Sequence, residues 1–109
     1  MATIYKVLGQ SAPSATTATT LYTVPASTDT VVSTIVVANR AASAGSYRIA
    51  IRPGGASLAN SHYLAYDVAI AANDSTALTL GITLDATDVI TVYASSADMT
   101  FTAFGSEIS

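Results

Sequence analysis

The side chains that could carry acid–base chemistry are few in this sequence. His62 is the single histidine and lies beside Tyr63, whereas serine and aspartate are so frequent that a Ser-His-Asp set forms no specific pattern. The Gly-x-Ser-x-Gly turn that exposes the nucleophile of many serine hydrolases does not occur. We interpret His62 as a polar loop residue and predict no catalytic residue and no enzyme activity. A small hydrolase that uses His62 is the least favoured alternative.

Carboxylates that could bind a metal ion all fall at predicted turns: Asp29, Asp74, Asp85, Asp88 and Asp98. The Asp-x-x-Asp spacing at 85–88 could contribute oxygens to a calcium site, but aspartate also favours turns by bonding to nearby backbone amides. We favour the structural interpretation and predict no metal site and no cofactor. The glycine-rich turn at 53–55 has neither the spacing nor the lysine of a phosphate-binding loop.

Tyrosine is the residue type with the clearest potential for recognition. The six tyrosines are Tyr5, Tyr22, Tyr47, Tyr63, Tyr66 and Tyr93. Most are expected in the core or at strand edges. Tyr63, however, is predicted to point outward beside Arg52, and aromatic residues with arginine are favoured anchors of interfaces. A patch that contacts sugar or protein is therefore the functional alternative.

The composition narrows the class of protein without naming an activity. Half of the 109 residues are hydrophobic, only 10% are charged, and the net charge is −3, against about 25% charged residues in an ordinary domain. Four scattered cations argue against nucleic-acid binding, and the absence of cysteine excludes disulfides and thiol chemistry. No apolar run has the roughly 18 residues of a membrane helix. The first residues lack the pattern of a signal peptide, so we expect synthesis and use in a cytosol.

Hydrophobic alternation with a period of two predicts strands throughout the chain. It is clearest in Ser46–Arg52, where Tyr47, Ile49 and Ile51 share one face. Short turns rich in Pro, Gly, Asn, Asp and Ser separate the segments, as in antiparallel sandwiches. We predict an all-β antiparallel β-sandwich, jelly-roll or Greek-key like, of about eight strands at 3–8, 19–24, 30–39, 46–52, 62–70, 76–84, 88–94 and 99–105.

Two hairpins follow from matching faces. The first pairs 46–52 with 63–70, and it places Arg48 opposite Asp67, Arg52 opposite Tyr63, Ile49 opposite Tyr66 and Ile51 opposite Leu64. Leu64, Tyr66, Val68 and Ile70 then share one face of their strand. The second hairpin folds about 95–98, and it places Ala94 by Met99, Val92 by Phe101 and Ile90 by Ala103.

Two segments leave alternatives open. Residues 30–39 carry apolar groups on both faces, which fits a central strand of the sandwich or a strand buried at a subunit contact. Gln10–Thr20 has almost no side chain that could anchor a core, so it is either a surface loop or part of an arm that lays Thr3–Leu8 against a neighbouring subunit. We divide the chain into an N-terminal strand and extended arm (1–20) and a β-sandwich domain (21–109).

The predicted exterior is unusual for a free monomer. Ala, Ser and Thr supply 50 of the 109 residues, and they dominate the outward strand positions, whereas monomers generally keep a charged surface. Small side chains let two surfaces approach closely at little entropic cost. We infer that other protein, either copies of this chain or a larger scaffold, covers much of this exterior. The alternative is an abundant protein under no pressure for solubility.

Several segments resemble small virion proteins of tailed bacteriophages. They are Leu21-Tyr22-Thr23-Val24-Pro25-Ala26, Val32-Ser33-Thr34-Ile35-Val36-Val37-Ala38-Asn39-Arg40, His62-Tyr63-Leu64-Ala65-Tyr66-Asp67, Ile70-Ala71-Ala72-Asn73-Asp74, and the stretch from Val92-Tyr93-Ala94-Ser95-Ser96 to Phe104-Gly105-Ser106-Glu107. The likeness covers about residues 8–108. It implies a β-sandwich that assembles as a homotrimer and acts without cofactor.

The resemblance implies a capsid decoration (cement) protein, which binds the major capsid protein or another virion protein on the head exterior after assembly in the host cytoplasm. Neither nucleic acid nor membrane is an expected partner. The expected interface residues are Ile4, Tyr5, Lys6, Leu8, Gln10, Arg40, Arg48, Arg52 and Tyr63. The alternative is a neck, tail or fibre component that binds a receptor or carbohydrate through Tyr63, Tyr66 and Tyr93.

Overall fold

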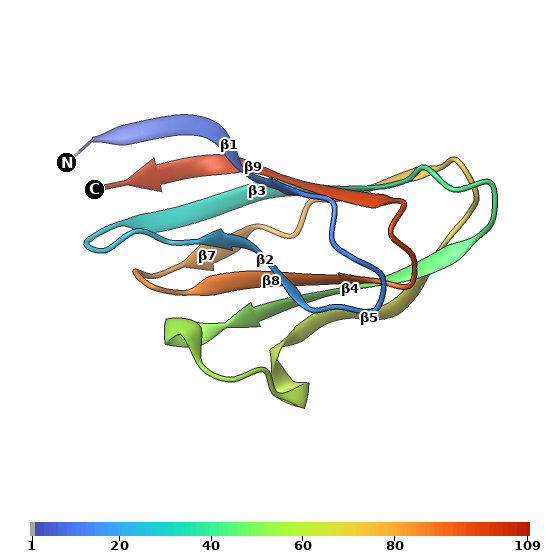
Figure 1. The fold of residues 1–109 in the computed structure, drawn as a ribbon. Helices are drawn as coiled ribbons and strands as arrows, with labels where there is room; N and C mark the ends of the chain where they lie inside the picture. Colours follow the sequence, from blue (N-terminus) through green and yellow to red (C-terminus); the bar gives the residue numbers. More distant parts are fainter. Residues whose placement is uncertain (1) are drawn as a thin grey trace.

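A computed structural model describes residues 2–109, which form two antiparallel sheets packed face to face (Figure 1). The strands are β1 (Thr3–Ser11), β2 (Thr19–Thr23), β3 (Asp29–Asn39), β4 (Gly45–Arg52), β5 (Tyr63–Ile70), β6 (Ser75–Leu78), β7 (Ile82–Leu84), β8 (Val89–Ala94) and β9 (Met99–Ile108). Two short 3-10 turns, η1 (Pro53–Gly55) and η2 (Asn60–His62), lie between β4 and β5. The predicted all-β sandwich is therefore confirmed.

The strand order is that of a jelly roll. One sheet has the order β1-β9-β3-β6, with β7 also paired to β3, and the other has the order β2-β8-β4-β5. β6 and β7 pair with successive parts of β3, so together they occupy one strand position, and eight positions in two sheets result. The single strand predicted at 76–84 is wrong, because the chain breaks at Leu80 and at Gly81, whose φ is +63°.

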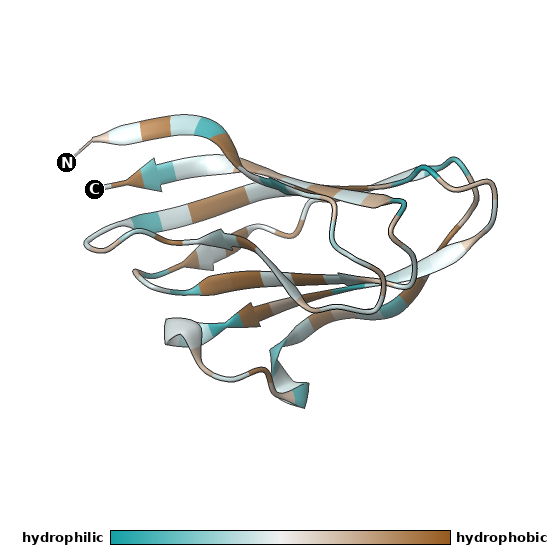
Figure 2. Ribbon diagram, viewed as in Figure 1, coloured by the Kyte–Doolittle hydropathy of each residue, from teal (hydrophilic) through white to brown (hydrophobic). Residues whose placement is uncertain are grey.

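The core lies between the two sheets and follows the predicted alternation. Hydrophobic segments alternate with polar ones along β3, β4 and β8 (Figure 2). Tyr47 and Phe101, from opposite sheets, are fully buried and meet edge to face with ring centroids 6.3 Å apart. β3 lies between β9 and the β6/β7 position, which confirms that 30–39 is a central strand.

The first predicted hairpin is correct at one end only. β4 and β5 pair in the predicted register from Gly45↔Ile70 to Tyr47↔Val68, but two shifts follow, and Ile49 then lies opposite Ala65. A bulge at Asp67, whose φ is +51°, causes the first shift. A one-residue shift moves every later side chain to the other face.

Because of the shift, the predicted pairs of Arg52 with Tyr63, Ile49 with Tyr66 and Ile51 with Leu64 are wrong. Of the four residues predicted to share a buried face, only Ile70 is buried, and Leu64, Tyr66 and Val68 are exposed.

The second predicted hairpin is wrong, since β8 and β9 belong to different sheets. The 95–98 turn crosses from one sheet to the other. The residues predicted to pair, including Val92 and Phe101, instead face the same core from opposite sides and are fully buried.

The N-terminal region is part of the sandwich. β1 pairs with β9 along its length, and Gly9 packs so closely on the Leu21 carbonyl that an added Cβ would collide with it. In the following segment Pro13 is buried and the Thr16 amide donates to the Ala94 carbonyl. Residues 2–20 and the rest of the described chain thus share one core, while Met1 of the predicted 1–20 region lies outside the described residues.

Candidate protein-binding surfaces

A cluster of tyrosines around Arg48 covers part of the outer face of the β2-β8-β4-β5 sheet. The Arg48 guanidinium lies 4.1 Å from the ring centre of Tyr66 on β5 and 4.2 Å from that of Tyr93 on β8. Its Nε donates to Asp67 Oδ1 at 2.6 Å, and its second terminal nitrogen donates to Oδ2 at 3.3 Å. Tyr63 meets Tyr66 edge to face at 4.9 Å. We name these five residues the Tyr–Arg cluster.

The charges within the cluster are balanced, and its side chains contact one another. The predicted Arg48–Asp67 pair is confirmed. The hydrogen bonds that Arg48 donates to Asp67 raise the pKa of the Arg48 guanidinium further above its ordinary value, against a smaller opposing effect of desolvation. Tyr66 remains 56% exposed. The Arg48 guanidinium already contacts the Asp67 carboxylate and one ring face each of Tyr66 and Tyr93. A ligand would therefore contact the ring edges and the opposite ring faces of the two tyrosines.

The other two predicted arginines lie apart from the cluster. Arg52 donates to Thr91 Oγ1 at 3.0 Å and to the carbonyls of Gly55 and Ala56, so it ties η1 to the sheet. Arg40 is exposed and reaches the Ala97 carbonyl at 3.4 Å. Within the described chain neither forms an ion pair with a carboxylate, and they do not join Arg48 in one basic patch.

The predicted N-terminal interface residues divide between the two faces of β1. Tyr5 is 83% exposed and Ile4 55%, and Gln10 is also exposed. Leu8 belongs to the hydrophobic core, so its assignment to an interface is wrong: it follows Ile4 and Lys6 on the inward face of β1.

The last residue of this group, Lys6, leads to a polar network that the sequence did not predict. Its ammonium lies 3.1 Å from Glu107 Oε1, and the other oxygen of Glu107 accepts a hydrogen bond from the Tyr22 hydroxyl at 2.5 Å. Tyr22 also bonds to Thr30 Oγ1 at 2.9 Å. The network joins β2 of one sheet to β1, β3 and β9 of the other.

The network shifts the titration of both of its central groups. The hydrogen bond from Tyr22, and to a lesser extent Lys6, lowers the pKa of Glu107. Burial, reinforced by Glu107, raises the pKa of Tyr22 to about 12. The network therefore holds Glu107 charged and Tyr22 neutral at ordinary pH.

The candidates for metal binding and catalysis have local structural contacts. Asp88 accepts from the Gly54 amide at 2.8 Å and from the Asp85 amide at 2.9 Å. His62 Nδ1 accepts from the Ala59 amide within η2. In residues 2–109 no three His, Asp or Glu side chains are grouped as a metal site would need, and no helix there has the length and apolarity to cross a bilayer.

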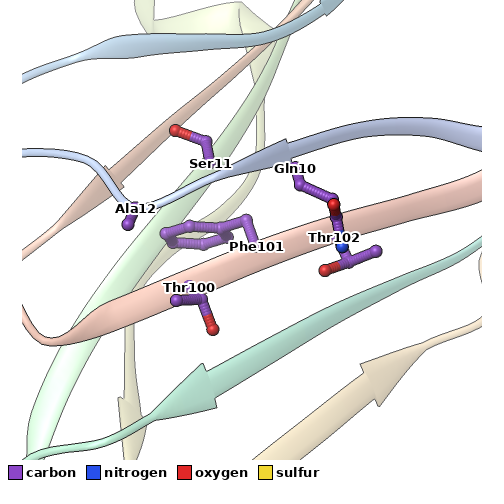
Figure 3. A pocket seen from close by; sticks show the side chains of 6 residues that line it. All are labelled: Gln10, Ser11, Ala12, Thr100, Phe101 and Thr102. Atoms are coloured by element: carbon purple, nitrogen blue, oxygen red, sulfur yellow. The ribbon is translucent and has the colours of Figure 1, made fainter.

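A shallow hollow of about 380 Å³ lies where β1 ends beside β9. Figure 3 shows its lining, with Gln10, Ser11 and Ala12 on one side and Thr100, Phe101 and Thr102 on the other. Phe101 belongs to the core, and the remaining groups are short and uncharged. The hollow offers hydrogen bonds but no titratable group.

A second hollow, of about 520 Å³, lies on the outer face of the five-stranded sheet. Tyr5, Val31 and Phe104 supply its apolar walls. Sequence reasoning named Tyr5 but missed the other two. The outward direction of Val31 depends on the bulge in β3, whereas Phe104 points outward by the regular alternation of β9.

Comparisons with protein-family models, curated proteins and solved structures find no match for this chain.

Proposed function

We propose that this chain is a non-enzymatic structural protein, a capsid decoration (cement) protein that binds the exterior of a phage head and stabilises the shell. The resemblance of its sequence segments to small phage virion proteins supports this role. The jelly roll recurs in viral capsid domains, and that support is an analogy of fold alone.

The observation that carries the proposal is the Tyr–Arg cluster. Tyrosine and arginine are enriched among the residues that dominate binding energy at protein interfaces. Here Arg48 is already fixed between Tyr66 and Tyr93 and bonded to Asp67. Little side-chain entropy is lost when a partner covers such a cluster. It is therefore suited to dock on a protein surface.

Stabilisation of the shell follows from mass action. A protein that binds the closed shell but not the dissociated subunits favours the closed shell, by an amount that grows with its concentration over Kd. No bond is made or broken, and no cofactor takes part. A specific contact of this kind buries upwards of about 1,000 Å² in total.

The test uses heads of the encoding phage, stripped of accessory proteins, and the Tyr66→Ser variant. Tyr66 is 56% exposed, so its loss leaves the core intact. The control is Leu80→Ser, which removes an apolar side chain of similar exposure (53%) away from the cluster. Wild type and control should co-sediment with heads at a fixed ratio to capsid subunits and raise the temperature of shell disruption, while Tyr66→Ser binds about 10- to 100-fold more weakly. No binding by the wild type, or equal binding by both variants, refutes the proposal.

A second candidate, a carbohydrate-binding module of a tail or fibre, is favoured by the same exposed rings. Sugars stack on aromatic faces, but Arg48 already lies over Tyr66 and Tyr93, so only the opposite ring faces are open. Copy number separates the two functions: a head decoration is present in hundreds of copies per particle and a tail module in a handful. Electron microscopy of the particle would place the chain on head or tail.

A further inference from the structure

The outer face of the five-stranded sheet has no charged side chain across its whole central part. Tyr5, Ser106, Val31 and Thr83 lie side by side in one row across β1, β9, β3 and β7. The rows that follow toward the other end contain only apolar, hydroxyl and amide side chains among the described residues. Asp29 marks the margin at the start of β3. Lys6 extends to Glu107 on the opposite side of the sheet.

The outward side chains on this face are larger at one end of the strands than at the other. At one end stand the large side chains of Tyr5, Val31 and Phe104, which line the 520 Å³ hollow together with part of Lys6, and Val7 lies beside Phe104. At the other end the outward residues, apart from Gln10 and Val36, are small: Ala38, Ser75, Ala77, Thr100 and Thr102. When a second copy is turned end for end, the large side chains of each copy lie over the small side chains of the other, so the two surfaces are complementary in shape.

Charge favours the same occupant. In a two-fold contact the same patch lies on both sides, so a charge near its centre meets an identical charge. Like charges across an interface are strongly unfavourable. An uncharged patch avoids this repulsion, while the opposite outer face, with Arg48, Arg52 and Asp67, does not.

The face also has the size that a stable dimer needs. Four strand positions about 4.8 Å apart and ten residues at about 3.4 Å each give a plane of roughly 19 by 34 Å, or about 650 Å² before side-chain relief is added. A standard interface buries about 800 Å² per partner. The plane is close to that size and represents about an eighth of the 5407 Å² surface of the chain.

We propose that this face pairs with the same face of a second copy about a two-fold axis that lies in the interface, perpendicular to the strands. The end of each copy with large side chains then covers the end of the other with small side chains, with Thr102 of each copy over Phe104 of its partner. The species in solution is a dimer, in place of the homotrimer that the resemblance implies. The inference deepens the proposed function by naming the occupant of one face, and leaves the Tyr–Arg cluster free for the shell.

The test introduces a charge at Thr102, a partly buried strand position on this face. Sedimentation equilibrium of the wild type at about 10 µM should give 22 kDa, twice the 11.0 kDa of the chain. Thr102→Lys and Thr102→Asp should each weaken the dimer about 100-fold or more and give monomers. An equimolar mixture of the two should restore 22 kDa, because the introduced ammonium and carboxylate then lie only two residues apart along the facing strands, within reach of the long lysine side chain. The control, Thr23→Lys, makes the same change on β2 of the other sheet and should remain a dimer.

Tyr5→Ser supplies a second variant that cannot disturb the core, because Tyr5 is 83% exposed; it should weaken the dimer about tenfold or more. A monomeric wild type, a trimer that Thr102→Lys leaves intact, or a mixture that stays monomeric overturns the inference. The two proposals fail separately. A monomer that still binds heads refutes only this contact, and a dimer that binds no heads refutes only the shell role.

Discussion

Replacing Tyr22 by Phe removes one hydroxyl group from the contact between the two sheets. Tyr22 is 8% exposed, and its ring remains in the core after the change. The loss is confined to the hydrogen bonds with Glu107 and Thr30. The variant therefore isolates the polar network from the packing around it.

The expected cost follows from the charge of the acceptor. A hydrogen bond to an ionised group contributes about 1.5–3 kcal/mol. We expect the lower part of this range, because Glu107 keeps Lys6 and some contact with water, with 13% of its side chain exposed. At this chain length each kcal/mol lowers Tm by about 4 °C, so Tyr22→Phe should lose about 6 °C or more.

The pH dependence gives the more specific signature. Glu107 has a lowered pKa in the folded state, so its stabilisation is present above the unfolded value of about 4.3 and is lost as pH falls through the folded pKa. Tyr22 has a raised pKa of about 12, so its contribution is present below the unfolded value of about 10 and is lost as pH rises toward 12. The stability difference between wild type and variant should be flat between these limits and shrink on both sides.

Urea unfolding followed by circular dichroism from acid to alkaline pH measures this difference. Lys6→Met is the control. With 44% of its side chain exposed, the Lys6 ion pair should contribute only about 0.2–1 kcal/mol, and its loss should leave the alkaline decline unchanged. A Tyr22→Phe variant as stable as wild type at neutral pH, or a difference that does not depend on pH, would refute the role given to the network.

Three further predictions concern a strand glycine and the turn around Asp88. Gly105→Ala should destabilise the fold by about 3 kcal/mol or more, the upper end of overpacking costs, because its Cβ would collide with the Val31 carbonyl. Gly54→Ala, where nothing lies near the new Cβ, should cost only about 1–2 kcal/mol for its positive φ; equal Tm losses would contradict the first statement. Asp88→Ala should cost about 1–3 kcal/mol, since it leaves the amides of Gly54 and Asp85 without their acceptor. Calcium should leave the wild-type Tm unchanged, and a rise with calcium would reopen the metal-site alternative.

Alternation within strands was readable from the sequence because it reports burial of one face. It predicted the positions of strands in both sheets, and it predicted the pair of Arg48 with Asp67 at the centre of the Tyr–Arg cluster. It failed at Asp67 itself, since a single residue with positive φ reverses the faces of the rest of β5. Tyr66, which was predicted to share a face with Ile70, is 56% exposed, whereas Ile70 is buried.

Which strands pair with each other was harder to predict from the sequence than where the strands lie. A short polar turn such as 95–98 fits a hairpin and a crossover between sheets equally well, and only packing of the whole core decides between them. The contact of Tyr22 with Glu107 spans 85 residues, and no local pattern marks it. The strand predicted to end at residue 105 also stopped short of Glu107, which lies in β9.

The position of β9 has a consequence for how the protein is made. This strand lies between β1 and β3 in its sheet although it follows both in the chain. A ribosome therefore releases β1 and β3 well before the strand that joins them, and the five-stranded sheet cannot close until Met99–Ile108 has emerged. During that delay the valine-rich β3 has an open edge and an uncovered apolar face, the features that promote aggregation of nascent chains. Slow translation of the last codons would lengthen this exposure, and holding chaperones would protect the chain through it.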